Sequence, residues 1–359
     1  MLLRLIKIIV FSSSIFLMAC ESGPKTREPY PKWQDQAQWT QFKQCFIKKD
    51  GRVIDTWQSD GSHSEGQGYG MLLATAVHDK ETFDQLWLWT QSNLQIRDDD
   101  LMVWRWQNTK PFTPDMNNAT DGDLLIAWAL IRAGEIWREQ RTDYLFHANK
   151  ILTSLAESVV KKNKRHFLLP AAYGFEHDEY YVVNLSYYVY PALFDAARLQ
   201  VDGPWRDLLE DGLDMLKTSL SHDGIPTDWN RIDRISGNFI ERPYPKLVED
   251  DLTYERFGYE AIRIPLYSCW INGCQSGFDG LKAFWREMSL PPAWIDLSGG
   301  EQAEYPLAKG GMAIRDLLLE KRIGDKYKFN QCNDSSDYYN SVLSLLSQVA
   351  LNDSKVFDL

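Results

Sequence analysis

The chain of 359 residues is 44% apolar and 25% charged, a balance typical of a soluble globular protein with one or two domains. Its 39 lysines and arginines stand against 50 aspartates and glutamates, and the net charge of −11 argues against nucleic acid or an anionic membrane surface as a partner. The 14 tryptophans and 17 tyrosines supply flat faces for core packing or for stacking on sugar rings.

The first 20 residues have the features of an export signal. Arg4 and Lys7 precede an apolar stretch, residues 8–16, that is too short to span a membrane as a helix. The sequence Leu17-Met-Ala-Cys20 follows and resembles a bacterial lipobox. The resemblance implies removal of residues 1–19 as a lipoprotein signal peptide and a lipid on Cys20. Ordinary secretion with an unmodified cysteine is the alternative.

A lipid on Cys20 places the protein in the bacterial cell envelope. Glu21 follows it, and not the aspartate that retains lipoproteins in the inner membrane, so we expect the outer membrane. Residues 20–32 are rich in proline and predict an extended tether. No composition shift or long linker divides residues 33–359, which predicts a single domain, and we expect a monomer.

Periodic apolar patterns predict a mostly α-helical domain. Helices are expected at residues 39–48, 65–77, 80–94, 119–137, 143–160, 187–199, 204–220, 265–270, 276–288, 305–319 and 336–351. Residues 52–55 and 102–106 are expected to be extended, and residues 221–258, rich in proline, glycine and charge, to form loops. Wholly apolar helices roughly alternate with amphipathic ones, which favours a ring of helical hairpins with inner and outer helices.

Three apolar runs each follow a carboxylate. Glu65 precedes residues 71–77, Asp121 precedes residues 124–131, and Glu260 precedes a helix that we expect to start near Pro265. Helices packed side by side in one barrel would bring these amino-terminal ends to a common mouth.

Helix capping offers a simpler explanation for part of this pattern. Thr120 followed by Asp123 predicts a capping box, and acidic residues at this end complement the helix dipole. Capping does not require Asp121, however.

The sequence contains no motif for metal-dependent, serine-nucleophile or phosphate-binding chemistry. The six histidines show no metal-ligand spacing, and there is no Gly-x-Ser-x-Gly elbow or phosphate-binding loop, so neither a metal nor another cofactor is expected. The glycines of residues 66–70 follow no strand and are expected to let the backbone approach a ligand or a neighbouring helix. Paired carboxylates remain, and these suit glycoside hydrolysis, which needs a protonated acid and a carboxylate on opposite faces of the sugar.

Several segments resemble one family of enzymes. Residues 119–137 are similar, position by position, to the active-site signature of glycoside hydrolase family 8. Residues 64–71 resemble its general-acid segment and residues 258–263 its base segment. Residues 184–187, 226–229 and 337–343 resemble segments of bacterial cellulases from cellulose-synthesis operons. The resemblance implies an all-α (α/α)6 barrel and an inverting endo-β-1,4-glucanase that acts on cellulose or a related exopolysaccharide.

The resemblance also implies a role for individual residues. Glu65 is the expected general acid, kept protonated by burial against aromatic rings, and Glu260 is the expected general base. Asp121 would hold the distorted sugar at the cleavage point, Tyr187 would lie beside the attacking water, and Arg263 would orient Glu260. The expected substrate-binding residues are Tyr69, Trp57, Trp104, Trp106, Asp123, Tyr187, Trp229 and Arg263.

One residue departs from the family pattern. The family's cellulases carry aspartate where this chain has Glu260, and the extra methylene moves the carboxylate by about 1 Å, a misplacement that can cost roughly 100-fold in rate. Asp251 and Glu255 are alternative bases. A glycan-binding lipoprotein without turnover is the alternative function, and chitosan, xylan and mixed-linkage glucan are alternative substrates.

Four cysteines remain once Cys20 is assigned to lipid. Cys45, Cys269, Cys274 and Cys332 allow three disulfide pairings in an exported protein. Cys269 and Cys274 flank a Trp-Ile-Asn-Gly segment that can turn at a helix end and let the two meet.

Overall fold

The computed structural model describes residues 30–107, 114–140, 143–220, 224–241, 252–274, 277–328, 332, 337–354 and 356–357. The expected signal peptide, Cys20, most of the expected tether and Asp251 lie outside these ranges. The described residues contain eleven α-helices: α1 Gln36–Phe46, α2 Ser64–Ala76, α3 Lys80–Asn93, α4 Thr120–Ile136, α5 Tyr144–Ser158, α6 Tyr190–Leu199, α7 Trp205–Ser219, α8 Arg263–Asn272, α9 Asp279–Glu287, α10 Lys309–Leu318 and α11 Tyr338–Asn352. None of these helices is long and apolar enough to cross a membrane.

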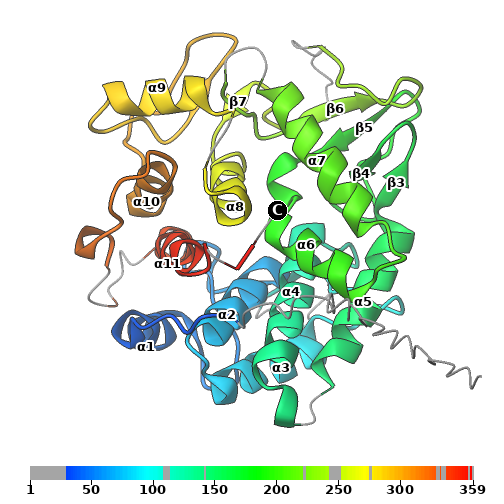
Figure 1. Ribbon diagram of the computed structural model, residues 1–359, viewed down its shortest axis with the longest axis vertical. Helices are drawn as coiled ribbons and strands as arrows, with labels where there is room; N and C mark the ends of the chain where they lie inside the picture. The colour runs from blue at the N-terminus through cyan, green and yellow to red at the C-terminus, as the bar shows by residue number, and fades with distance from the viewer. Residues whose placement is uncertain are drawn as a thin grey trace, which may run out of the picture.

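Six helices of the described chain form a closed inner ring (Figure 1). α2, α4, α6, α8, α10 and α11 contact one another in this order, and α11 packs back against α2. Residues 120–134 of α4 are all buried, as expected for a helix whose residues 124–131 are apolar on every side. The predicted (α/α)6 barrel is confirmed by this ring and by the solved structures described below.

The helices α1, α3, α5, α7 and α9 lie outside the ring and bury one face each. In α5, for example, Ala148, Ile151, Leu152 and Leu155 are buried at helical spacing. The alternation breaks between α10 and α11, which are both inner helices. The described part of the segment between them holds a short 3-10 turn, Asp325–Tyr327.

Four two-stranded antiparallel ribbons occur among the described residues. They pair β1 Ser62–His63 with β2 Arg105–Trp106, β3 Val160–Lys162 with β4 His166–Leu168, β5 Tyr180–Val183 with β6 Asn230–Asp233, and β7 Arg256–Phe257 with β8 Ile295–Asp296. The region 221–258, expected to be loops, thus contributes two strands in its described part. β1 and β7 come just before α2 and α8, so these ribbons border the amino-terminal ends of the inner helices.

The cysteines form two disulfides, one of the three possible pairings. Cys269 and Cys274 are joined across the end of α8, and Cys45 on α1 is joined to Cys332, 287 residues further on. The second bridge ties an outer helix to the segment before α11.

The carboxyl ends of the inner helices are closed by a buried polar cluster. Arg132 of α4 and Asp353 at the end of α11 form an ion pair of 2.6 Å with both side chains fully buried. The ring of Tyr30 lies 3.7 Å from the Arg132 guanidinium carbon, and its hydroxyl donates a hydrogen bond to Asp195. Tyr30 is buried, so the folded part reaches three residues into the segment expected to be a tether, 20–32.

Candidate active site

The amino-terminal ends of α2, α4 and α8 meet at a cavity of about 590 Å³. Its walls include the acidic side chains of Glu65, Asp121 and Glu260 together with Arg263. The common mouth expected from the sequence is therefore present. Aromatic residues border the same space: Trp57, Trp104, Tyr187, Tyr259, Tyr305 and Tyr339.

Glu65 lies in the first turn of α2, which packs closely on α4. A Cβ atom at Gly68 would lie 2.6 Å from the Cβ of Leu125, so only glycine permits this approach. The expectation that these glycines admit a neighbouring helix is confirmed. His63 caps the helix, because its Nδ1 accepts a hydrogen bond of 2.9 Å from the backbone N–H of Gly66. Its Nε2 faces Asp55 at 3.5 Å.

The start of α4 differs from the expected capping box. Ala119 is the N-cap, and the hydroxyl of Thr120 donates to the backbone oxygen of Leu169 at 2.8 Å. Asp123 accepts hydrogen bonds from the N–H of Met102 at 2.8 Å and the side chain of Asn118 at 2.9 Å. The capping-box prediction is wrong because both side chains are used to hold neighbouring segments.

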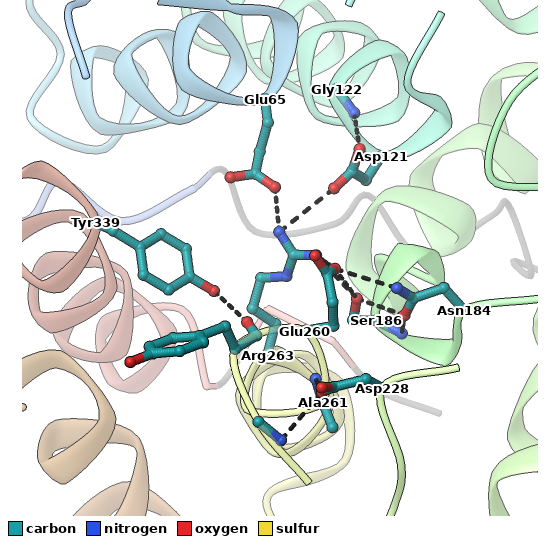
Figure 2. Close-up of polar contacts among 12 residues, drawn as sticks. Glu65, Asp121, Gly122, Asn184, Ser186, Asp228, Glu260, Ala261, Arg263 and Tyr339 are labelled. Atoms are coloured by element: carbon teal, nitrogen blue, oxygen red, sulfur yellow. Dashed lines mark hydrogen bonds and ion pairs between the residues drawn. The ribbon is translucent and has the colours of Figure 1, made fainter. Parts of the chain in front are cut away.

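Arg263 lies at the floor of the cavity and joins its carboxylates (Figure 2). Nη1 contacts Glu65 and lies 3.5 Å from Oδ2 of Asp121, while Nη2 contacts Glu260. The Arg263 side chain is only 4% exposed, so its charge acts where solvent screens little. Glu65 and Glu260 are thus held on the two terminal nitrogens of one guanidinium group.

Glu260 is held through one of its two carboxylate oxygens. Oε2 accepts from the side chains of Asn184 at 3.1 Å and Ser186 at 3.4 Å, and from Arg263. Within the described ranges no hydrogen bond reaches Oε1, and the residue lines the cavity. This arrangement leaves one oxygen able to accept a proton from a water molecule.

The pKa values of Glu65 and Asp121 are shifted in opposite directions. Burial opposes ionisation of Glu65, but the charges of Arg263 and His63 outweigh it, and its pKa lies below the usual value. Burial and the charge of Glu65 raise the pKa of Asp121 well above its usual value. The expected rise in the pKa of Glu65 is therefore not found in the free enzyme. The two carboxyl groups influence each other's pKa, and of the two Asp121 holds a proton more readily.

Four of the expected substrate-binding residues line the cavity: Trp57, Trp104, Tyr187 and Arg263. Trp57 is the most open, with 75% of its surface exposed. The guanidinium of Arg263 lies 5.7 Å from the ring centroid of Tyr187, which places that tyrosine beside the carboxylates.

The other four expected residues do not border the cavity. The fully buried Tyr69 shares a hydroxyl hydrogen bond of 2.7 Å with Tyr267. Trp106 packs edge-on against Trp89, and Trp229 packs behind Tyr187 with ring centroids 6.2 Å apart. Asp123 is fully buried, and burial raises its pKa to about 7. From these positions the four residues can support the walls of the cavity, but they do not face a ligand bound in it. Glu255, the described alternative base, does not line the cavity either.

Sequence reasoning missed three tyrosines that line the cavity, Tyr259, Tyr305 and Tyr339. Tyr259 and Tyr305 are about half exposed, and their hydroxyls lie 3.0 Å apart. The hydroxyl of Tyr339 donates to the backbone oxygen of Tyr259 at 2.6 Å. Tyr259 could have been found because it directly precedes Glu260. Tyr305 was expected to begin a helix, whereas α10 starts at Lys309.

The comparisons with known proteins agree with this geometry. Residues 15–353 match the family model "Glycosyl hydrolases family 8". The chain is 36% identical over 320 residues to a probable endoglucanase of Novacetimonas hansenii, covering 87% of this chain and 90% of that one. It is 37% identical over 299 residues to an endoglucanase of Cellulomonas uda, covering 80% and 79%.

Solved structures give the same result. An endo-β-1,4-glucanase from Acetobacter xylinum superposes with a TM-score of 0.78 at 34% identity, covering 89% of this chain and 98% of that one. A second one, from an Achatina fulica gut metagenomic library, has a TM-score of 0.79 at 32% identity, covering 89% and 99%. A helical barrel with clustered carboxylates at its mouth is the architecture of a glycoside hydrolase. The chain belongs to glycosyl hydrolase family 8.

Proposed function

We propose that this family 8 enzyme is an inverting endo-β-1,4-glucanase that hydrolyses cellulose or a related exopolysaccharide. The observation that carries the proposal is the placement of Glu65 and Glu260 on the two nitrogens of the Arg263 guanidinium, facing one cavity. Glycoside hydrolysis needs two carboxyl groups that flank the scissile bond, and inversion, in which a water molecule attacks from the face opposite the leaving group, is what the family resemblance implies.

Each carboxyl has a distinct task in this proposal. Oε1 of Glu260 takes a proton from the attacking water while Oε2 stays bound to its three donors. Glu65 gives its proton to the glycosidic oxygen as the bond to the leaving sugar breaks. Asp121 stores that proton in the free enzyme, and it binds a hydroxyl of the distorted sugar when substrate is present.

The substrate class is supported by the relatives and by the cavity walls. The most similar proteins described above carry names of endoglucanases. Trp57, Trp104 and the Tyr259–Tyr305 pair line the cavity and offer flat aromatic faces on which glucose rings can stack. A cold-adapted family 8 xylanase among the structural neighbours is 16% identical to this chain, and that likeness shows the fold alone.

A glycan-binding protein without turnover is the second candidate. It is favoured by two observations, the glutamate at the position of the family aspartate and the ion pair that keeps Glu65 ionised in the free state. The two candidates differ in one measurement. We expect the purified wild type to release reducing ends from carboxymethyl cellulose, with the α-anomer appearing first by NMR. Tight binding of cello-oligosaccharides with no release of reducing ends would support the second candidate.

We also propose that a lipid on Cys20 anchors the enzyme in the bacterial outer membrane. Tyr30 is buried among the carboxyl ends of the inner helices, opposite the cavity, and it follows Cys20 by about ten residues. A tether of this length reaches at most about 35 Å, so the cavity would face away from the membrane. Intact-mass analysis of the membrane fraction tests the anchor. A mature chain that starts beyond Cys20, or one with an unmodified Cys20, would contradict it.

A further inference from the structure

The segment 226–229 lies directly behind the turn that carries Glu260, and the proposed mechanism gives it no role. Its Asp228 is 3% exposed. Oδ1 of Asp228 accepts hydrogen bonds from the backbone N–H of Gly258 at 3.0 Å and of Ala261 at 2.8 Å. Oδ2 accepts from the hydroxyl of Thr253 at 2.9 Å. One carboxylate therefore binds the backbone on both sides of the proposed base.

This contact is close and fixes the path of the turn. A Cβ atom at Gly258 would lie 2.8 Å from Oδ2 of Asp228, so a side chain there would push the carboxylate and the turn apart. Gly258 and Ala261 precede α8, and the buried carboxylate of Asp228 provides the partner that their backbone N–H groups need. Burial and the charge of Glu260 raise the pKa of Asp228 to about 6, which agrees with a position next to the base.

Glu260 has one more rotatable bond than aspartate, so both of its ends must be held for the carboxylate to point reproducibly. Asn184, Ser186 and Arg263 hold the carboxylate end. Asp228 holds the backbone end. The neighbouring Trp229 packs against Tyr187, so the same short segment supports two sides of the cavity.

We propose that Asp228 is a positioning residue for the catalytic base: by binding the N–H groups of Gly258 and Ala261 it fixes Glu260 so that Oε1 faces the cavity. The proposal rests on the proposed role of Glu260. It assigns a task to a buried carboxylate that never touches the substrate.

Two substitutions of Asp228 separate positioning from charge. Asp228→Ala removes the hydrogen bonds to the N–H groups of Gly258 and Ala261, and we expect kcat to fall roughly 100-fold with KM nearly unchanged, because the base is misplaced while the sugar contacts remain. Asp228→Asn keeps an oxygen that accepts from both N–H groups, so it should restore most of kcat. Equal losses in the two variants would overturn the positioning role.

Asp233→Ala is a matched control. Oδ1 of Asp233 also accepts from two backbone N–H groups, those of Ile235 at 3.2 Å and Ser236 at 2.6 Å, but this turn does not line the cavity. It should leave kcat unchanged. A similar loss of kcat in Asp233→Ala and Asp228→Ala would show a general effect of loosened turns and contradict the proposal.

Glu260→Gln distinguishes failure of this inference from failure of the proposed function. If Glu260→Gln stays active, the base assignment in the proposed function fails. If Glu260→Gln is inactive but Asp228→Ala has wild-type kcat, only the positioning role fails. Should Asp228→Ala not fold, Gly258→Ala replaces it, because the added methyl group displaces the same contact. We expect it to lower kcat with cello-oligosaccharide affinity retained, and an unchanged kcat would overturn the proposal.

Discussion

Arg263 forms an ion pair with Glu65, the proposed general acid, which has to carry a proton to fill that role. An ion pair favours the ionised acid, so Glu65 alone would be unprotonated at neutral pH. Asp121 lies 3.5 Å from the same guanidinium nitrogen, and its raised pKa keeps a proton next to Glu65. The pair can then deliver this proton when bound sugar changes the contacts of Arg263.

The pH profile tests this proton sharing. In the wild type, kcat/KM should fall on the alkaline side when the Glu65–Asp121 pair loses its shared proton. Asp121→Asn leaves Glu65 beside Arg263 with no partner to hold the proton, so the alkaline limb should move to lower pH. The variant should also be slower, because Asp121 is the proposed partner of the distorted sugar, but the position of the limb is independent of that loss. An alkaline limb that stays in place would contradict a shared proton.

Glu65→Gln should abolish hydrolysis without changing the fold. The amide has nearly the same size but cannot give a proton to the leaving oxygen, a contribution worth roughly 100- to 10,000-fold. Affinity for cello-oligosaccharides, measured by calorimetry, should stay near that of the wild type. Turnover above about a tenth of wild type would show that another group is the acid.

Asp123 gives the protein a stability that depends on pH. Burial raises its pKa from 3.8 to about 7 in the folded state, so the folded chain binds this proton more tightly than the unfolded chain. Its stabilising contribution is present below pH 4 and is lost as the pH rises toward 7, by up to about 4 kcal/mol.

Asp123→Asn should remove this pH dependence. The variant loses a hydrogen bond to Asn118, so it should be less stable than wild type by about 1 kcal/mol at pH 5. At pH 8 it should be the more stable of the two in urea unfolding. The same difference between the proteins at both pH values would contradict the assignment.

The two disulfides should differ in their effect on stability. Cys45–Cys332 closes a loop of 287 residues, whereas Cys269–Cys274 closes one of five. Because a longer loop restricts the unfolded chain more, replacing Cys45 and Cys332 by serine should cost about 2 to 5 kcal/mol and more than the equivalent change at Cys269 and Cys274. Thermal unfolding of both double variants checks the order.

The sequence predicted a mostly helical fold well because apolar patterns report directly on burial, and the (α/α)6 barrel followed from the resemblance to family 8. The apolar run after Asp121 has no polar face, and α4 is indeed buried from residue 120 to residue 134. Contacts between distant segments were not predictable in the same way. Asn184 and Ser186 form hydrogen bonds with Glu260 only because α6 and α8 are neighbours in the ring. Asp123 accepts a hydrogen bond from the N–H of Met102 and does not cap its own helix. The lowered pKa of Glu65 likewise depends on a guanidinium group 198 residues away.

Glu260 itself provides the most informative test of the proposed mechanism. Glu260→Gln keeps the size of the side chain but cannot accept a proton from water, so it should eliminate hydrolysis. Glycan binding by this variant should persist, which distinguishes a lost base from a collapsed cavity. Wild-type activity in Glu260→Gln would show that another carboxylate is the base, and Asp251 and Glu255 would be substituted next.

Glu260→Asp restores the residue that the family's cellulases carry, yet the structure predicts a loss. The three donors to Oε2 are placed for a glutamate, and shortening the side chain withdraws the carboxylate by about 1 Å from Asn184, Ser186 and Arg263. We expect measurable activity, roughly 100-fold below wild type, since a carboxylate still faces the water at the wrong distance. A different result would be a wild type with no turnover and a Glu260→Asp variant that is active. In that case the natural protein would be a glycan-binding protein, because the extra methylene of Glu260 would hold its carboxylate away from the position that catalysis needs.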